Sequence, residues 1–342
     1  MPTATRCLFA LLTVALATAC DVTAPGVEAP GTPYFSFHVV AEAPPRFSDW
    51  SVPVHLGPEL NSAFVDSDPF VSRDGRSLYF VAGRGRGGSG GRDLWVSRRG
   101  SPDEPWGPPA NLGATVNSGG HENAPTLSPD GHRLYFASAR PGGLGGFDLY
   151  VSRRRDGRDD FGWGPPVAVE GVNTAADETD VTFFEEEETG AIVVYFSSSR
   201  PGGPGLDDIY VAGLERDGAF GPAVLVAELS TPFRDTHPAV RRDGLEIFLG
   251  SDRTGTFGNT DLWVATRATT TEPWSLPVNL GPVVNTPPRP PDLEQANDFR
   301  PALSFDGTTL YFAAAFRSGN VSDMFDLWVT TRSRLHGRDG VE

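Results

Sequence analysis

The sequence contains no lysine, so all 28 basic side chains are arginines, and they stand against 44 acidic side chains. The formal net charge at pH 7 is −16. Proteins bind phosphate backbones through basic surfaces, and a chain with this excess of acid does not offer one. The charge therefore argues against a nucleic acid as the main partner.

The chain also lacks long stretches without glycine or proline. It contains 40 Gly and 31 Pro. In a helix interior these residues cost roughly 1 and 3 kcal/mol each. A helical bundle and a long coiled coil are thereby excluded. The 39% of residues that are hydrophobic lie in short runs between the turns, which argues against disorder of the whole chain. An all-β domain rich in turns remains.

Cysteine is nearly absent, with two residues, and the N-terminal apolar run from Cys7 to Leu16 is short. Such a run does not span a bilayer. With Arg6 before it and small residues after it, the run is typical of an export signal. The sequence Leu16-Ala17-Thr18-Ala19-Cys20 resembles the lipobox of bacterial lipoproteins, which implies cleavage before Cys20 and lipidation of this cysteine. An ordinary signal peptide is the alternative.

These features predict the organisation of the chain. We expect a signal peptide over residues 1–19, and a lipidated Cys20 followed by a flexible tether through residue 46. A folded domain is expected over residues 47–332, followed by a C-terminal tail over residues 333–342. The protein is then expected in the bacterial cell envelope, anchored to a membrane by lipid and facing the periplasm or the cell surface. The choice between inner and outer membrane stays open.

Five repeats account for almost all of the sequence after residue 47. Each repeat has a short segment entered at proline or valine, a turn with glycine, a segment with aromatic residues, and a segment that begins with aspartate. The second repeat shows this order in Asp130-Gly131, Leu134-Tyr135-Phe136 and Asp148-Leu149-Tyr150-Val151. A run that contains an aromatic residue and proline, such as Trp163 to Val169, then leads to the next repeat.

Each repeat predicts four antiparallel strands, because Asp-Gly favours a hairpin and the flanking segments alternate as half-buried strands do. One such unit cannot bury both faces, whereas a ring of units can, which predicts a β-propeller. The domain opens with a fourth strand at Val52–Leu56 and ends after a third strand near Arg332. The N-terminal strand is therefore expected to close the last blade. The count gives five blades, and a sixth blade around Tyr34–Val40 is the alternative.

The second repeat also carries a longer pattern. It reads Glu-x-x-Pro-x-x-Ser-x-Asp-Gly over Glu122–Gly131, then Leu-Tyr-Phe-x-Ser-x-Arg-x-Gly-Gly over Leu134–Gly143, then Asp-Leu-Tyr-Val-Ser over Asp148–Ser152. This pattern resembles the WD40-like propeller repeat of TolB-type proteins, and the resemblance extends over residues 47–332. It implies a propeller architecture and a TolB-like binding role. It implies nothing specific about chemistry, because propellers support many unrelated functions.

Three polar positions per repeat are expected on the same face of the propeller. One is an acid three residues before the strand entrance, one is the arginine after the second strand, and one is the aspartate that opens the third strand. The acids are Asp66, Glu122, Glu178, Asp235 and Asp298; the arginines are Arg84, Arg140, Arg200, Arg253 and Arg317; the aspartates are Asp93, Asp148, Asp208, Asp261 and Asp326.

This polar network has three interpretations. Arginine forks that join carboxylates would form a structural framework, which the repetition in all five units favours. A binding surface is the second interpretation. A ring of carboxylates around a hard cation such as Ca²⁺ is the third, although no loop has a known metal spacing. No cofactor and no metal-ligand set are therefore assigned.

The sequence favours a non-enzymatic scaffold that binds an envelope protein or a polymer such as a polysaccharide or peptidoglycan. The alternative is a five-bladed propeller glycoside hydrolase or carbohydrate-binding protein, in which carboxylates surround the central funnel. The regularity of the acids argues against catalysis, which needs carboxyl groups in different environments, and no catalytic residue is assigned. Pairing of all five strand-entrance acids with arginines would weaken the enzyme and metal hypotheses further. The irregular loops 84–92, 185–188 and 286–297 are additional candidates for binding.

Overall fold

The computed structural model describes residues 45–335, apart from residues 188, 217, 288–295 and 322–323. The expected signal peptide, Cys20, nearly all of the tether and the sixth-blade segment Tyr34–Val40 lie outside the described residues. In the described part of the chain, no helix has the length and apolar character to cross a membrane. The short 3₁₀ turn η1 (Arg84–Arg86) lies between two strands of the first blade.

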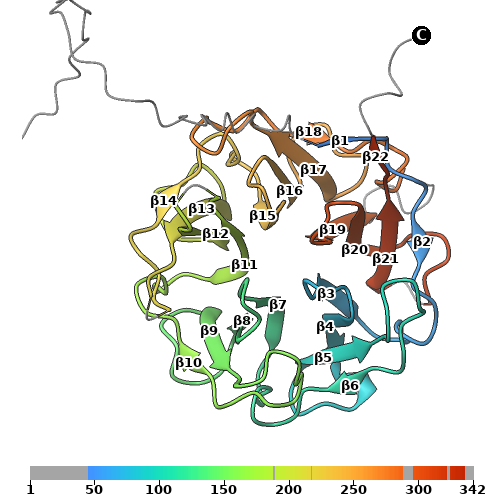
Figure 1. The fold of residues 1–342 in the computed structure, drawn as a ribbon, viewed down its shortest axis with the longest axis vertical. Coiled ribbons are helices and arrows are strands. Elements are labelled where there is room, and N and C mark those ends of the chain that lie inside the picture. The colour runs from blue at the N-terminus through green and yellow to red at the C-terminus, as the bar shows by residue number, and fades with distance from the viewer. Residues whose placement is uncertain (1–44, 188, 217, 288–295, 322–323, 336–342) are drawn as a thin grey trace, which may run out of the picture. The chain divides into compact units, whose positions relative to one another are not determined.

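Five four-stranded antiparallel sheets surround a central axis, which confirms the five-bladed β-propeller (Figure 1). Blade one contains β3 (Asp66–Val71), β4 (Ser77–Gly83), β5 (Arg92–Arg98) and β6 (Ala110–Asn111). Blade two contains β7 (Glu122–Leu127), β8 (Arg133–Ser138), β9 (Asp148–Arg153) and β10 (Val167–Ala168). Blade three contains β11 (Glu178–Glu185), β12 (Ile192–Ser198), β13 (Asp208–Gly213) and β14 (Val224–Leu225). Blade four contains β15 (Asp235–Val240), β16 (Glu246–Ser251), β17 (Asp261–Thr266) and β18 (Val278–Asn279).

Blade five is completed by the N-terminal part of the domain, as the order of the repeats predicts. It contains β19 (Asn297–Leu303), β20 (Thr309–Ala315), β21 (Asp326–Thr331) and, as its outermost strand, β2 (Val54–His55). Val54 lies opposite Val329, and His55 opposite Trp328. Beyond this closure, β1 (Arg46–Phe47) pairs with β22 (Arg334–Leu335). Paired structure thus extends slightly outside the expected range 47–332.

The hydrophobic core lies between neighbouring blades. One cluster joins Tyr79 and Val81 of blade one to Leu134 and Phe136 of blade two, together with Trp163. Equivalent clusters join the other blades. The aromatic steps that mark the repeats are therefore inter-blade contacts, and truncation of one such buried ring costs about 3–5 kcal/mol.

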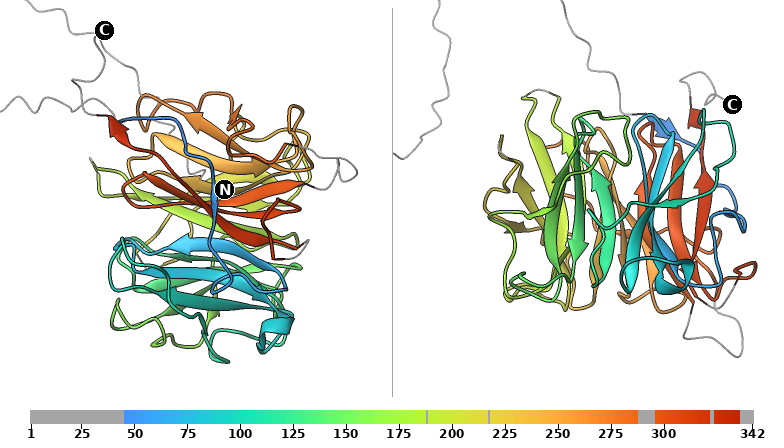
Figure 2. Two further views of the ribbon diagram at one scale, coloured as in Figure 1. Left: turned by 90° about the vertical axis from the view of Figure 1, so that its right-hand side faces the viewer. Right: turned by 90° about the horizontal axis from the view of Figure 1, so that it is seen from below.

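The innermost strands β3, β7, β11, β15 and β19 run between two faces of the propeller (Figure 2). We call the face on which these strands begin the entry face. The opposite face, which carries the hairpin turns after these strands, is called the turn face; the turns are centred on residues 74–75, 130–131, 189–190, 243–244 and 306–307.

Every innermost strand is interrupted by a bulge, at which its register with the next strand shifts. At each bulge one residue that is not glycine has a positive φ, a conformation that is uncommon for such residues. We call these residues the central group: Asp68 (φ 51°), Ala124 (φ 50°), Asp180 (φ 61°), His237 (φ 54°) and Arg300 (φ 59°).

Candidate functional site

The five strand-entrance acids are fully buried and bonded inside the protein. In each blade a serine or threonine of the preceding loop donates to the acid through its backbone N–H and its hydroxyl, as Ser62 does to Asp66 at 2.6 and 2.7 Å. The same arrangement holds in the other blades for Ser118, Thr174, Thr231 and Thr286. Burial raises the pKa of Asp66, and raises the pKa of Asp298 to about 6. We call these five residues the framework acids.

Each framework acid also forms an ion pair with an arginine. Arg140 lies 3.4 Å from Glu122, Arg200 lies 3.2 Å from Glu178, and Arg317 lies 3.0 Å from Asp298. Arg253 pairs with Asp235 in the same way. These pairs tie the loop after the second strand to the innermost strand, so they leave no open carboxylate ring for a cation.

Blade one departs from the predicted pairing. Arg86, not Arg84, lies 2.8 Å from Asp66, whereas Arg84 donates to the carbonyl of Gly90 at 3.3 Å. The cause is the 3₁₀ turn η1, which begins at Arg84 and carries the pairing guanidinium two residues further along the chain. Arg86 rests near the rings of Phe80 and Trp95, as the pairing arginines of the other blades rest near their equivalents.

The aspartates that open the third strands hold the neighbouring loops in place. Asp148 accepts from the backbone N–H of Leu144 at 2.9 Å, and Asp261 accepts from Phe257 and Asn279 at 2.7 Å each. The remaining three accept bonds in the same loop: Asp93, Asp208 and Asp326. A Cβ on Gly143 would lie 1.9 Å from Oδ2 of Asp148, so this close contact requires glycine.

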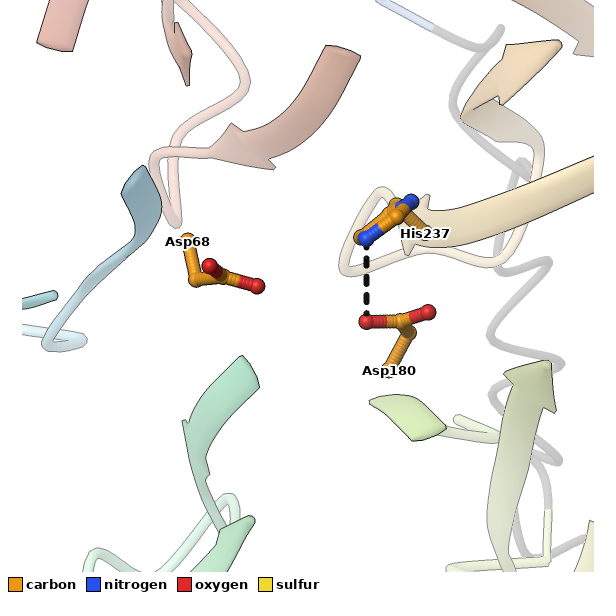
Figure 3. A group of neighbouring side chains, drawn as sticks. All are labelled: Asp68, Asp180 and His237. Carbon is orange, nitrogen blue, oxygen red and sulfur yellow. Dashed lines mark ion pairs between the residues drawn. The ribbon is translucent and has the colours of Figure 1, made fainter. Parts of the chain in front are cut away.

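The central group lies two residues after the framework acids, and here the blades differ from one another. Figure 3 shows Asp68, Asp180 and His237 pointing toward one another from blades one, three and four. Nε2 of His237 lies 3.3 Å from Oδ1 of Asp180, and Arg300 forms an ion pair with Asp68. One carboxylate oxygen of each aspartate and one imidazole nitrogen all lie within 4.8 Å of one another.

Neighbouring side chains fix the orientation of the central group. Ser67 donates its hydroxyl to Asp68, and Thr179 donates to Asp180, at 2.7 Å in both cases. Nδ1 of His237 lies 2.7 Å from the hydroxyl of Thr236. The residue before each of these three members therefore holds its side chain, so the group is preorganised.

Burial sets the charges in the central group. It lowers the pKa of His237, against the opposing effect of Asp180 and Asp207, so the imidazole is neutral at pH 7. Burial also lowers the pKa of Arg300 to about 9, which leaves its guanidinium charged at pH 7. One imidazole and two carboxylates suit a transition metal better than Ca²⁺, which takes oxygen ligands. A cation bound here would compete with Arg300 for Asp68.

A cavity of about 1260 Å³ opens on the turn face. Its lining includes the residues that directly follow four members of the central group: Pro69, Val181, Pro238 and Pro301. The cavity thus reaches from the hairpin turns to the level of the central group. The hairpin turns themselves form its outer walls.

The central group was not predicted from the sequence. Its signal was nonetheless present, because the residue before the strand-entrance position is Asp68, Ala124, Asp180, His237 and Arg300 in the five repeats. The repeat pattern is defined by residues that recur, whereas the chemical type of this residue differs between repeats. Unequal environments, which catalysis requires, arise here and not at the framework acids.

No protein-family model matches the chain, and no curated protein matches it. Several solved structures do. A thermostable family-43 glycoside hydrolase is 13% identical, with 84% of this chain and 95% of that chain covered and a TM-score of 0.54. An α-L-arabinofuranosidase from Lactobacillus brevis is 17% identical, with coverage of 81% and 94% and a TM-score of 0.54. The GH43_1 enzyme from Xanthomonas citri, complexed with xylose, is 16% identical, with coverage of 85% and 92% and a TM-score of 0.53.

These neighbours overturn the TolB-type interpretation. The expectation of a TolB-like, protein-binding lipoprotein scaffold without enzymatic activity is wrong, because the similar solved structures described above are glycoside hydrolases. The TolB-type interpretation was based on the repeated residues. These residues form framework pairs and loop contacts, so they indicate the blade architecture and not the function. At identities of 13–17%, the likeness establishes the architecture: this chain has the β-propeller fold of these glycoside hydrolases.

Proposed function

We propose that the protein is a glycoside hydrolase whose reaction centre is the central group. The observation that carries this proposal is the convergence of Asp68 and Asp180 from two different blades, with carboxylate oxygens within 4.8 Å. Most glycoside hydrolases use a pair of carboxyl groups that flank the glycosidic bond. The neighbours that are named as an arabinofuranosidase and as an enzyme complexed with xylose support glycosides of pentose sugars as the substrate class.

The two carboxyl groups have different partners, which permits different roles. Asp68 is paired with the Arg300 guanidinium and acts as the carboxylate. Asp180 lies 3.3 Å from the imidazole of His237, and in this proposal it serves as the proton donor.

In the proposed reaction, Asp180 protonates the glycosidic oxygen as its bond to the anomeric carbon breaks. Asp68 stabilises the positive charge that develops on the sugar. Water then adds its hydroxyl to the anomeric carbon and returns a proton to Asp180, so the enzyme is restored. A polysaccharide or oligosaccharide, not a protein, is the partner in this proposal.

The cavity on the turn face provides space for a sugar chain next to the central group. Its volume of about 1260 Å³ exceeds the roughly 300–1000 Å³ of ordinary ligand pockets. The innermost strands place Pro69, Val181 and Pro238 at its inner end, one residue away from Asp68, Asp180 and His237. A bound sugar would approach the carboxyl pair from this side.

Hydrolysis of 4-nitrophenyl α-L-arabinofuranoside and β-D-xyloside, and of arabinan and xylan, tests the proposal with the full chain. The wild-type protein should release product from at least one of these substrates. Asp68→Asn and Asp180→Asn should each lower kcat/KM at least about 100-fold, because acid–base and electrostatic roles contribute on this scale.

The exposed Asp103 provides a matched control, since Asp103→Asn makes the same chemical change on the surface and should leave turnover unchanged. Thermal melting of each variant verifies that it is folded. Absence of turnover of any glycoside, or full activity in both central variants, would refute the proposal.

A further inference from the structure

A second set of equivalent positions lies where the innermost strands end. In each hairpin turn, the second residue lines the cavity. This residue is an arginine in two blades and a different amino acid in each of the other three. Turn hydrogen bonds, such as those from Gly75 to Ser72 and from Gly190 to Glu186, establish the equivalence. We call these the mouth positions: Arg73, Pro129, Glu187, Arg242 and Phe305.

Three mouth positions from adjacent blades form a cluster. The guanidinium carbon of Arg73 in blade one lies 4.3 Å from the centre of the Phe305 ring in blade five. The guanidinium carbon of Arg242 in blade four lies 4.7 Å from the same ring centre. Two cations from different blades are thus held at one aromatic ring, within cation–π distance.

Both arginines are exposed, and neither forms an ion pair with any residue of the described part of the chain. Two other arginines of the same cavity, Arg98 and Arg154, both pair with Asp160 at 2.7 and 2.8 Å. Two guanidiniums without an ion pair to any described residue thus lie beside one aromatic ring, in a chain with a net charge of −16. A guanidinium that rests on a ring keeps N–H donors at its edge for an oxyanion.

No acid of the described residues forms an ion pair with Arg73 or Arg242, and the nearby acids have other partners. Asp74 and Asp306 accept bonds from serines and backbone groups within their own turns. Glu186 accepts from the hydroxyls of Thr189 and Thr270. At the mouth positions themselves, the exposed Glu187 of blade three is acidic, whereas Arg73 of blade one and Arg242 of blade four are basic.

We propose that Arg73, Arg242 and Phe305 form a subsite for an oxyanion on a sugar ligand, either a carboxylate or a phosphate ester. Two guanidinium forks can bind the oxygens of one such group, while the rest of the sugar extends into the cavity. The sugar part of this inference rests on the proposed function, whereas the anion part stands on the geometry of the cluster alone.

Calorimetric titration of the full chain at low ionic strength tests the subsite. The probes are trigalacturonate, glucose 6-phosphate, inorganic phosphate and neutral xylotriose, with Asp180→Asn as the protein so that no hydrolysis occurs. At least one anionic sugar should bind ten-fold or more tightly than xylotriose, and added salt should weaken this preference. The two anionic sugars distinguish a carboxylate from a phosphate ligand.

The double variant Arg73→Gln/Arg242→Gln should abolish the preference. Arg76→Gln is the control, because Arg76 lines the same cavity, and its replacement removes one positive charge away from the Phe305 ring. Its affinities should change less than two-fold. An unchanged preference in the double variant, or an equal loss in the control, overturns the subsite.

The binding results for the anionic probes test the subsite separately from the proposed glycoside hydrolase activity. If inorganic phosphate binds as tightly as the anionic sugars, the sugar assignment is overturned and an anion site alone remains. If no anionic probe binds, the whole inference is overturned. Binding is measured without turnover, so a failure of the glycoside hydrolase assay leaves these results interpretable.

Discussion

Nε2 of His237 lies 3.3 Å from Oδ1 of Asp180, so an imidazole of blade four meets a carboxylate of blade three at the centre of the propeller. His237 is largely buried, and its other ring nitrogen lies 2.7 Å from the hydroxyl of Thr236. The imidazole thus has a polar neighbour at each ring nitrogen. Protonation would place a charge in this buried position, which gives the folded protein a dependence on pH.

The pH dependence of stability tests the neutral state of His237. Burial lowers the pKa of His237 in the folded protein, so the unfolded chain binds the proton first as the pH falls below about 6.5. Stability should therefore decrease as the pH falls through this value, by at most about 1.4 kcal/mol per pH unit from this group. Urea unfolding of wild type and His237→Gln between pH 5 and 8 should show the decrease in the wild type and a smaller one in the variant.

The control for this measurement is His121→Gln, which alters an exposed histidine. Its stability curve should run parallel to that of the wild type. Parallel curves for His237→Gln and the wild type would contradict a lowered pKa.

Loss of a framework arginine should strongly destabilise the propeller. Arg253 pairs with the fully buried Asp235 and also donates to the carbonyl of Leu229 at 2.8 Å. Arg253→Met leaves a buried carboxylate without its partner, which should lower the free energy of unfolding by about 3–5 kcal/mol. Arg234→Met is the control, because Arg234 is 61% exposed and lies 3.6 Å from Asp207; it should cost less than about 1 kcal/mol. Equal losses in the two variants would show that the framework pairs contribute no more than surface pairs.

In blade two, Gly142 and Gly143 follow the second strand, and we expect that Gly143 cannot be replaced by a larger residue without a loss of stability. A Cβ at Gly143 would lie 1.9 Å from Oδ2 of Asp148, so Gly143→Ala forces the loop or the aspartate to move. We expect a loss of about 1–3 kcal/mol. At Gly119 a Cβ meets no atom within 4 Å, and Gly119→Ala should be nearly neutral. Melting temperatures of the two variants provide the comparison, and an unchanged value for Gly143→Ala would disprove the close contact.

The fold could be predicted from the sequence because all five blades use the same residue types at equivalent positions. The turn glycines, the aromatic segments and the aspartate of the third strand recur in the same order in each repeat. Each further repeat therefore strengthens the prediction of a four-stranded blade. The ion-pair partner of Asp66 was predicted as Arg84 but is Arg86, because a local 3₁₀ turn that the repeat pattern does not reveal brings Arg86 to this carboxylate.

The central group was missed for a different reason. Its residues converge through a positive φ at a bulge, and neither the bulge nor the convergence of three blades is encoded in the spacing of one repeat.

The pairing of the two ends of the domain has a consequence for its synthesis. β2 emerges early from the ribosome, but its partner β21 is completed only with Thr331. Blades one to four can form from contiguous chain, whereas blade five must join segments separated by almost the whole domain, a contact with a high entropic cost. A strand near the C-terminal end of the domain thus completes a blade together with a strand near its N-terminal end. Removal of Val54–His55 should leave the outer edge of β21 unpaired, whereas removal of Asp326–Thr331 should also delete the buried Leu327 and Trp328 from the core.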